Sequence, residues 1–234
     1  MAYRCLFFDL DNTLWDCDAN AKAVLLELYD QYGIGAWFPS PNAFYDAYKS
    51  NNDRLWRAFA QGRVFKPELN RERFLAPFRG KMPEPEAEQL AARVCADFMA
   101  RLVLETRVMP GALELLDYLK SRRYRMFVVS NGFSEVQYGK LRHSGLAPYF
   151  ERVFLSEDLR EHKPDKRFFD LAVMSANARK AESLVIGDNF DADIVGAHAA
   201  RIPQVYYEPV PREGVRPFEP TYHIHDLLEL KTIL

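Results

Sequence analysis

Apolar and polar residues follow two different patterns along the chain. From Met109 onward, short apolar runs alternate with segments in which apolar residues recur every three to four positions. The first pattern indicates buried β-strands and the second amphipathic helices, so the alternation predicts a parallel sheet with right-handed helical crossovers. A further apolar run, at residues 5–8, predicts a first strand. The elements expected after Met109 are helix 111–120, strand 125–129, a helix from Ser134, strand 153–155, helix 168–175, strand 184–186, helix 191–200, strand 205–207, strand 222–224 and helix 226–230.

A helical pattern without strands fills the segment between the first apolar run and Met109. Residues 21–32 and 86–104 each place apolar side chains on one helical face. Prolines mark the expected helix boundaries, at Pro39, Pro41, Pro67, Pro83 and Pro85. A crossover between parallel strands needs only about a dozen residues, so this longer segment is best explained as an inserted domain. We therefore expect an α/β fold, with a Rossmann-like, doubly wound parallel sheet core of residues 1–17 and 106–234 and a helical cap of residues 18–105.

Two aspartates directly follow the first apolar run. Asp9 and Asp11 are spaced two apart, so in an extended backbone both side chains point to the same side, at the carboxyl end of a buried strand. Open α/β sheets bind ligands at this edge. Two close carboxylates repel each other unless a cation lies near them, so the pair indicates a reaction centre with a metal ion. The alternative, from these residues alone, is an ordinary polar turn, which Asp and Asn favour.

Composition narrows the class of protein. The chain has 234 residues, 48% of them apolar, and its formal net charge of −2 gives no sign of a nucleic-acid or membrane-surface partner. Its cysteines, Cys5, Cys17 and Cys95, lack the spacing of a zinc site and fit reduced thiols. No apolar run approaches the roughly 20 residues of a membrane span, and the first run is shorter than that of a signal peptide. We expect a cytoplasmic protein, either a monomer or a weak dimer.

Four polar clusters stand at the ends of predicted strands or in the loops that follow them. They are Asp9-x-Asp11-x-Thr13, Ser130-Asn131-Gly132, Lys163-Pro164, and Gly187-Asp188 with Asp193. In a doubly wound sheet these edges converge on one crevice. In this order, with a helical insertion after the first, the clusters resemble the haloacid dehalogenase superfamily over the whole chain. Residues 130–132 and 187–194 look most like its bacterial pyrimidine 5′-nucleotidase branch, although Arg201 stands where relatives usually carry glycine.

The residue types in these clusters suit phosphoryl transfer, and most members of the superfamily are phosphatases. Asp9 is the expected nucleophile, which forms an aspartyl phosphate. Asp11 is expected to protonate the leaving oxygen and later to take a proton from the attacking water. Phosphate oxygens are expected to contact Thr13, Ser130, Asn131, the backbone at Gly132, and the cationic, catalytic Lys163.

Carboxylates beside a phosphate favour Mg2+, which proteins hold through one or two carboxylates plus waters and substrate. The expected ligands are the side chains of Asp9 and Asp188 and, by the resemblance, the backbone carbonyl of Asp11. Asp193 is expected one layer behind, orienting Asp188 or Lys163. The expected partner is therefore a small phosphorylated metabolite, with no nucleic-acid polymer and no membrane involved.

The resemblance implies a magnesium-dependent phosphomonoester hydrolase. Nucleoside monophosphates are the expected substrates, because aromatic and basic residues gather in and near the cap, on which a base can stack: Trp15, Tyr45, Tyr48, Arg54, Trp56 and Arg57. Three enzymes of the same fold are alternatives: a sugar-phosphate phosphatase, a phosphomutase, and a carbon–halogen hydrolase, which needs neither Asp11 nor magnesium. A non-catalytic module that binds a phosphorylated ligand is a fourth.

Other patterns allow two interpretations each. His223-x-His225 suggests either a metal site or a structural pair; the structural reading is favoured because no carboxylate partner is evident. Trp15, Phe44, Tyr48 and Trp56 suggest either a stacking surface or, more strongly, the hydrophobic core of the cap. Ser134 and Gln137 have the spacing of a capping box. Residues 208–220 are rich in proline and charge and look like a surface loop.

Overall fold

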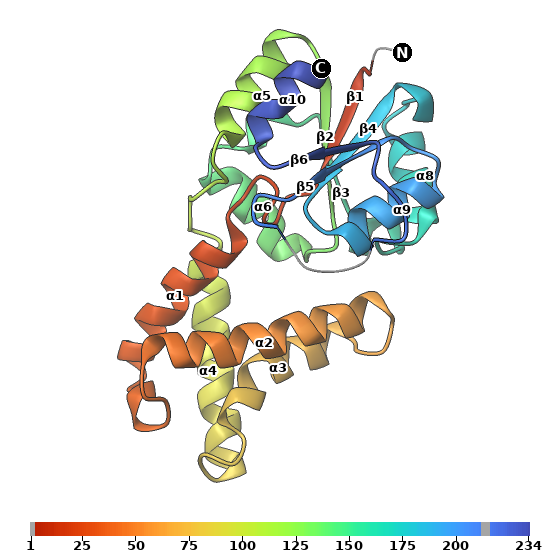
Figure 1. Cartoon of the computed structure of the whole chain (residues 1–234). Helices are drawn as coiled ribbons and strands as arrows, with labels where there is room; N and C mark the ends of the chain where they lie inside the picture. Colours follow the sequence, from red (N-terminus) through yellow and green to blue (C-terminus); the bar gives the residue numbers. More distant parts are fainter. Residues whose placement is uncertain (1–2, 212–215) are drawn as a thin grey trace. The chain divides into compact units, whose positions relative to one another are not determined.

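The computed structural model describes residues 3–211 and 216–234 and separates the chain into two compact units (Figure 1). The sheet unit consists of Met1–Cys17 and Thr106–Leu234, and the helical unit of Asp18–Glu105. The boundaries between the units lie where the hydrophobic pattern of the sequence changes. No helix within the described ranges is both long and apolar enough to cross a lipid bilayer.

The sheet unit is built on six parallel strands in the order β3-β2-β1-β4-β5-β6. The strands are β1 (Cys5–Phe8), β2 (Arg125–Ser130), β3 (Arg152–Leu155), β4 (Ser183–Gly187), β5 (Gln204–Tyr207) and β6 (Tyr222–Ile224). This is the order of a doubly wound, Rossmann-like sheet, in which the chain moves outward in both directions from the central strand. The predicted α/β core is confirmed, and the strand bounds lie within one residue of those expected.

Helices cover both faces of the sheet. In Figure 1, α5 (Ala112–Ser121) and α10 (Leu230–Ile233) lie on one side, and α8 (Lys166–Ser175) and α9 (Val195–Ala199) on the other. Alternate strand residues point to opposite faces, and Phe7 joins its register partners Phe127 and Val185 in the core that contains residues of α8 and α9. Burying one such aromatic side chain contributes about 1.5–3 kcal/mol, so this layer holds the central strands in register.

The winding of the sheet changes direction between β1 and β4. Doubly wound sheets bind ligands at this switch point, outside the carboxyl ends of the strands. β1 ends at Phe8 and β4 at Gly187, and the Asp9 N–H donates a hydrogen bond to the Ile186 carbonyl over 2.8 Å. Asp9 and Asp188 therefore begin the two loops that flank the switch point.

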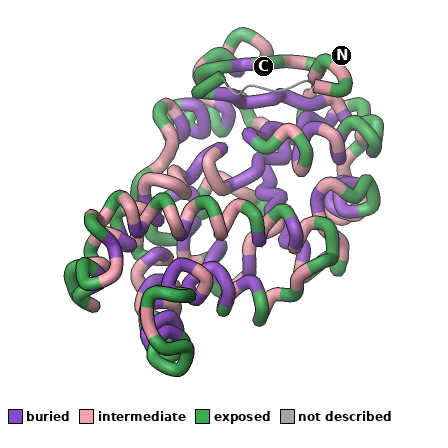
Figure 2. Tube along the Cα trace, turned by 60° about the horizontal axis from the view of Figure 1, so that its bottom comes forward, coloured by how far each residue is buried: buried purple, intermediate pink, exposed green. Residues whose placement is uncertain are grey.

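The helical unit is held together by an aromatic core. Its helices are α1 (Cys17–Gln31), which starts at the last residue of the sheet unit, α2 (Pro41–Ala60), α3 (Lys66–Leu75) and α4 (Glu84–Leu102). Prolines occupy the first turns of α2, α3 and α4, where a missing N–H costs no hydrogen bond. Figure 2 shows buried and exposed residues alternating along these helices. The buried aromatic residues that pack together are Phe44, Tyr48, Phe74, Phe78 and Phe98.

Three predicted features need revision. Phe44 and Tyr48 belong to the core of the helical unit, as favoured, but Trp15 is buried within the sheet unit and so serves neither as a cap surface nor as cap core. The helix expected at 191–200 divides into a π-helical turn, Phe190–Ile194, and α9. The loop expected at the surface includes residues 212–215, which lie outside the described residues, but Glu208 at its start is buried.

The chain leaves and re-enters the sheet unit at neighbouring positions. Trp15 and Val108 form an antiparallel bridge, and the Met109 N–H donates to the Leu14 carbonyl over 2.9 Å. The outgoing segment directly follows the loop that carries Asp9 and Asp11. Residues 18–105 are therefore an insertion whose two connections are paired with each other.

Candidate active site

A buried lysine joins two of the predicted acidic residues. Lys163 Nζ lies 2.6 Å from Asp9 Oδ1 and 2.6 Å from Asp193 Oδ1, and it also donates to the Val129 carbonyl over 3.1 Å. The lysine side chain is 3% exposed, that of Asp9 10% and that of Asp193 1%. Asp193 reaches this position from the π-helical turn after β4, where its other oxygen accepts a hydrogen bond from the Asn189 N–H over 3.2 Å.

A buried threonine links Asp9 to the loop after β4. The Thr13 hydroxyl lies 3.2 Å from Asp9 Oδ2 and 3.3 Å from Asp188 Oδ1, and it accepts a hydrogen bond from the Asp188 N–H over 3.0 Å. Thr13 is completely buried. Its hydroxyl thus bridges the two carboxylates that flank the switch point; a direct contact with phosphate stays a prediction.

This cluster has an excess of negative charge that a divalent cation would offset. Carboxylate oxygens of Asp9, Asp188 and Asp193 lie within 4.8 Å of one another, and the Lys163 ammonium contacts Asp9 and Asp193. Burial raises the pKa of Asp9 well above its ordinary value; Lys163 opposes this, and the charges of Asp193 and Asp188 add to it. Burial alone would lower the pKa of Lys163, but Asp193 and Asp9 raise it above its ordinary value. Three buried carboxylates and one ammonium carry a net negative charge, and oxygen is the ligand that Mg2+ prefers, so these residues fit a magnesium ion.

Asn131 holds the loop that carries Lys163. Its side-chain Nδ2 donates to the Lys163 carbonyl over 2.9 Å, and its Oδ1 accepts from the Lys163 N–H over 2.9 Å. This reciprocal pair ties the end of β2 to a segment 32 residues later in the chain. The structure therefore gives Asn131 a positioning role, and its predicted contact with phosphate is untested.

Ser130 and Gly132 form the turn after β2. Ser130 Oγ accepts hydrogen bonds from the Gly132 N–H over 3.0 Å and from Gln137 Nε2 over 2.7 Å. A Cβ atom at Gly132 would overlap the side-chain amide of Gln137. A glycine is therefore needed at this position because the Gln137 side chain approaches the backbone closely.

Two residues of α6 (Ser134–His143) contact Asp11 and were not predicted. Lys140 Nζ lies 2.6 Å from Asp11 Oδ1, and Gln137 Nε2 donates to Asp11 Oδ2 over 2.8 Å. Both are buried although polar, and Lys140 Nζ also lies 4.4 Å from the centre of the Trp15 ring. Their spacing of three places them on one face of the helix, a signal that the sequence does contain.

The predicted capping box at the start of α6 is wrong. The Ser134 side chain makes no capping hydrogen bond, and Phe133 is the N-cap residue. Instead Glu157, from α7 (Ser156–Leu159), accepts a hydrogen bond from the Ser134 N–H over 2.8 Å. A carboxylate from another element thus satisfies the helix terminus, which frees Gln137 to bind Asp11.

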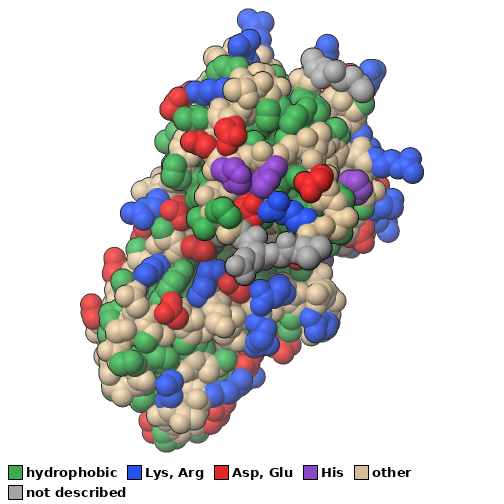
Figure 3. Space-filling model, viewed as in Figure 1, with side chains coloured by type: hydrophobic (Ala, Val, Ile, Leu, Met, Phe, Trp, Pro, Cys, Tyr) green, Lys and Arg blue, Asp and Glu red, His purple; other side chains and the backbone are tan. Residues whose placement is uncertain are grey.

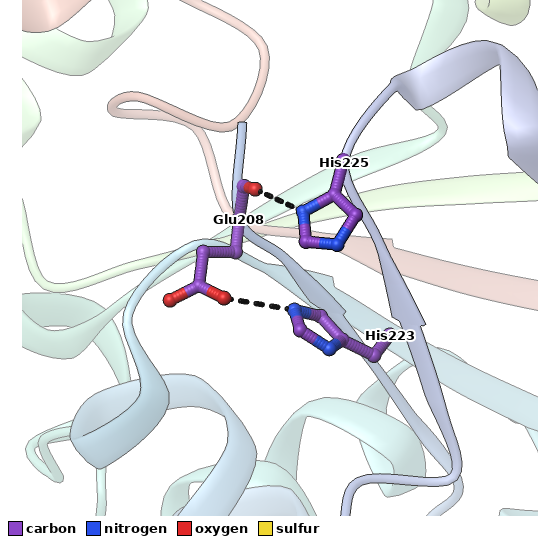
Figure 4. Close-up of side chains that lie close together, drawn as sticks. All are labelled: Glu208, His223 and His225. Carbon is purple, nitrogen blue, oxygen red and sulfur yellow. Dashed lines mark hydrogen bonds and ion pairs between the residues drawn. The ribbon is translucent and has the colours of Figure 1, made fainter. Parts of the chain in front are cut away.

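The histidine pair His223-x-His225 does have a carboxylate partner. His223 Nε2 lies 2.9 Å from Glu208 Oε2 (Figure 4). The expectation that no such partner exists is wrong because Glu208 follows β5, 15 residues earlier in the chain, and pairs with β6 across the sheet.

Comparison with known proteins agrees with this geometry. Residues 3–201 match the family model of haloacid dehalogenase-like hydrolases. The chain is 34% identical over 231 residues to the pyrimidine 5′-nucleotidase PynA of Streptococcus pneumoniae, covering 98% of this chain and 94% of that protein. It is 27% identical over 238 residues to the pyrimidine 5′-nucleotidase YjjG of Escherichia coli, covering 100% of this chain and 99% of that protein. The crystal structure of the HAD-hydrolase YfnB of Bacillus subtilis bound to magnesium matches with a TM-score of 0.86 at 31% identity, covering 100% and 99%.

The two relatives and the solved structure match over nearly the whole chain, and the family model spans the four polar clusters singled out in the sequence. The resemblance inferred from the four clusters is therefore confirmed, as is the similarity to bacterial proteins named as pyrimidine 5′-nucleotidases. The chain belongs to the haloacid dehalogenase-like hydrolases.

Proposed function

We propose that the protein is a magnesium-dependent phosphomonoester hydrolase that forms an aspartyl phosphate and acts on nucleoside monophosphates. The observation that carries this proposal is the position of Asp9 at the switch point, 2.6 Å from the buried Lys163. A carboxylate in that position can attack phosphorus, and the ammonium beside it offsets negative charge on the carboxylate and on the phosphoryl oxygens.

In the first step, a carboxylate oxygen of Asp9 forms a bond to phosphorus while the bond from phosphorus to the ester oxygen breaks. Asp11 donates a proton to that oxygen, and the alcohol leaves. Lys140 and Gln137 each hold one oxygen of the Asp11 carboxylate, which keeps its side chain beside the switch point.

In the second step, Asp11 takes a proton from a water molecule whose oxygen attacks phosphorus. The bond between phosphorus and Asp9 breaks, inorganic phosphate leaves, and the Asp9 carboxylate is restored. Thr13 and Lys163 hold Asp9 through both oxygens, so its orientation is set before the substrate arrives.

The carboxylates of Asp9 and Asp188, with the Asp11 carbonyl, are the proposed magnesium ligands. A bound Mg2+ would offset the repulsion between phosphate and these carboxylates. Asp193 has both oxygens engaged, by Lys163 and by the Asn189 N–H, which supports a role in orienting Lys163.

The helical unit corresponds in this proposal to the cap domain of the family, and it selects the substrate. Its two connections pair with each other directly after the Asp9–Asp11 loop. Tyr45 and Trp56 of α2 are half-buried aromatic residues outside the fully buried core of the helical unit, and we propose that they contribute to contact with the base. The nucleotidase proposal rests further on the 34% and 27% identity to PynA and YjjG.

The test is a panel of phosphomonoesters assayed for phosphate release with and without Mg2+. Pyrimidine nucleoside monophosphates should exceed hexose phosphates and phosphoglycolate by about tenfold or more in kcat/KM, which is what one stacked base contributes. A higher kcat/KM for hexose phosphates or phosphoglycolate would refute the nucleotidase assignment, and only the more general assignment as a phosphatase would remain. Phosphate transferred to a second sugar hydroxyl instead of released would indicate a mutase, and halide release from a 2-haloacid a dehalogenase. No turnover of any compound, with retained phosphate binding, would indicate a non-catalytic module.

A further inference from the structure

We infer that Glu208, His223 and His225 form a second metal site, which takes a cation of the zinc type (Zn2+, Co2+ or Ni2+) and not Mg2+. This inference stands independently of the proposed function. A carboxylate oxygen of Glu208 and one ring nitrogen of each histidine lie within 4.8 Å of one another. A tetrahedral zinc ion spaces its ligand atoms about 3.3 Å apart, so the three donor groups would move closer together when they bind one ion.

The strand pairing brings these three residues together. β5 and β6 are parallel, with Tyr206 opposite His223, and Glu208 extends the pairing by donating its N–H to the Ile224 carbonyl over 2.9 Å. His223 and His225 are two apart on extended backbone, so they share one side of the sheet. Their ring centroids lie 4.6 Å apart. In Figure 4 both imidazoles point toward Glu208, and Figure 3 shows histidine side chains gathered at the surface of the sheet unit.

The hydrogen bond of His225 prepares one ring nitrogen for a metal. His225 Nδ1 lies 2.7 Å from the backbone carbonyl of Glu208, as Figure 4 shows. A carbonyl oxygen only accepts, so Nδ1 must carry the proton, and in the neutral ring Nε2 then bears a free lone pair. A backbone carbonyl that fixes the tautomer in this way is one of the usual partners of a metal-binding histidine.

The Glu208 carboxylate is buried and already oriented. Tyr206 donates its hydroxyl to Oε1 over 3.1 Å, while Arg216 and His223 contact Oε2 at 2.6 and 2.9 Å. The Glu208 side chain is 2% exposed, but that of His223 is 28% exposed, so an ion can reach the carboxylate from the histidine side. An ion placed between Oε2 and His223 Nε2 replaces the proton that now joins them.

The donor set selects the type of cation. Two imidazoles and a carboxylate match zinc sites, and imidazole also suits Co2+ and Ni2+. Mg2+ prefers oxygen ligands, of which the Asp9 and Asp188 cluster offers several carboxylates and the histidine cluster only one. The two clusters should therefore bind different metals at the same time.

The test is calorimetric titration of Zn2+ into protein that has been stripped of metal and then saturated with Mg2+, so that the Asp9 cluster is occupied. We expect one zinc ion per chain. His223→Ala and His225→Asn should each weaken binding by about 100-fold or more, since even indirect partners of a ligand contribute about 10–100-fold. The asparagine retains a donor for the Glu208 carbonyl, so this variant keeps the local structure while it removes the ligand.

His143→Ala is the matched control. His143 is an exposed histidine whose Nδ1 lies 3.0 Å from the Gly139 carbonyl, and within residues 3–211 and 216–234 no carboxylate contacts its ring. Its loss should leave zinc binding unchanged. Arg216→Gln removes a positive charge from beside Glu208 and should tighten binding several-fold.

Three results would overturn the proposal. First, the wild-type protein could fail to take up Zn2+ in the presence of Mg2+. If the His225 variant then also lowered the melting temperature, the cluster would have only a structural role in stabilising β6. Zinc binding could survive in both histidine variants, which would place the ion elsewhere. Equal or weaker binding by Arg216→Gln would show that the ion does not use the Glu208 carboxylate. Circular dichroism and melting of each metal-free variant establish that it is folded.

Discussion

Replacing Lys163 by methionine should destabilise the sheet unit far more than the loss of an ordinary salt bridge. Methionine fills a similar volume, so the change removes the charge and keeps most of the packing. It leaves two carboxylates, on Asp9 and Asp193, without the ammonium that now lies 2.6 Å from each. Removing one partner of a buried ion pair costs about 3–5 kcal/mol. Because two buried carboxylates lose their partner together, we expect the upper part of this range.

The matched control is Lys49→Met in the helical unit. Lys49 Nζ lies 2.6 Å from Asp53, the same distance as in the buried pairs, but the side chains are 31% and 40% exposed. An exposed pair of this kind contributes about 0–1 kcal/mol. Lys49 Nζ also lies 3.5 Å from Asp18, so each lysine faces two carboxylates and the difference between the two variants mainly reports the effect of burial.

The measurement is urea unfolding of both variants in EDTA at pH 7, with phosphatase activity assayed in parallel. The pKa of Lys163 is raised, so the stability that it contributes is complete below the pKa of an unfolded lysine, about 10.4, and is lost as the pH rises through the higher pKa of the folded state. The gap between wild type and Lys163→Met should therefore narrow only above about pH 10. A loss below about 1 kcal/mol, equal to that of Lys49→Met, would refute the buried network.

The remaining predictions concern chemistry, metal and pH. Asp9→Asn and Asp11→Asn should each lower phosphate release by several orders of magnitude in protein that is still folded by circular dichroism. Asp11→Asn should also lower the melting temperature, because the buried Lys140 loses the carboxylate that lies 2.6 Å from it. Near-normal turnover in either variant would refute the role assigned to that residue. EDTA should abolish activity and Mg2+ restore it, whereas Ca2+ should inhibit, because it takes more ligands at longer distances; full activity in chelator would exclude the metal. Burial alone would raise the pKa of Glu72, but Arg79 and Arg71 lower it, so the stability that Glu72 contributes is present above about pH 4.3 and lost as the pH falls through its lowered pKa. Glu72→Gln should therefore cost about 1 kcal/mol at pH 7 and almost nothing near pH 3 in thermal melts, and a constant difference would contradict the assignment.

Features that depend on local spacing could be predicted from the sequence. The alternation of strands and helices determined the fold class, because a buried strand and an amphipathic helix each need a distinct apolar period. Asp9, Lys163, Asp188 and Asp193 could be placed together because parallel strands end at one edge of a sheet.

Contacts between elements could not be predicted in the same way. Gln137 has the spacing of a capping residue, yet its amide binds Asp11 and Ser130, because Glu157 from a different helix occupies the helix terminus. Periodicity reports which face of α6 is buried, but not which polar group lies opposite Lys140. Glu208 was missed for a related reason, since a buried carboxylate next to a loop resembles an exposed one until the neighbouring strand is known.

The paired connections of the helical unit have an evolutionary consequence. Trp15 and Val108 form a bridge at the base of the insertion, so the two ends of any segment grafted there start as neighbours. Closing a chain between neighbouring ends costs little more entropy for a long insertion than for a short one, about 0.6 kcal/mol for each doubling of length. The sheet unit can thus exchange one inserted module for another without disturbing the register of β1. Asp9 and Asp11 lie in the loop just before the graft point, so an exchange of modules would leave unchanged the loop that we propose to be catalytic.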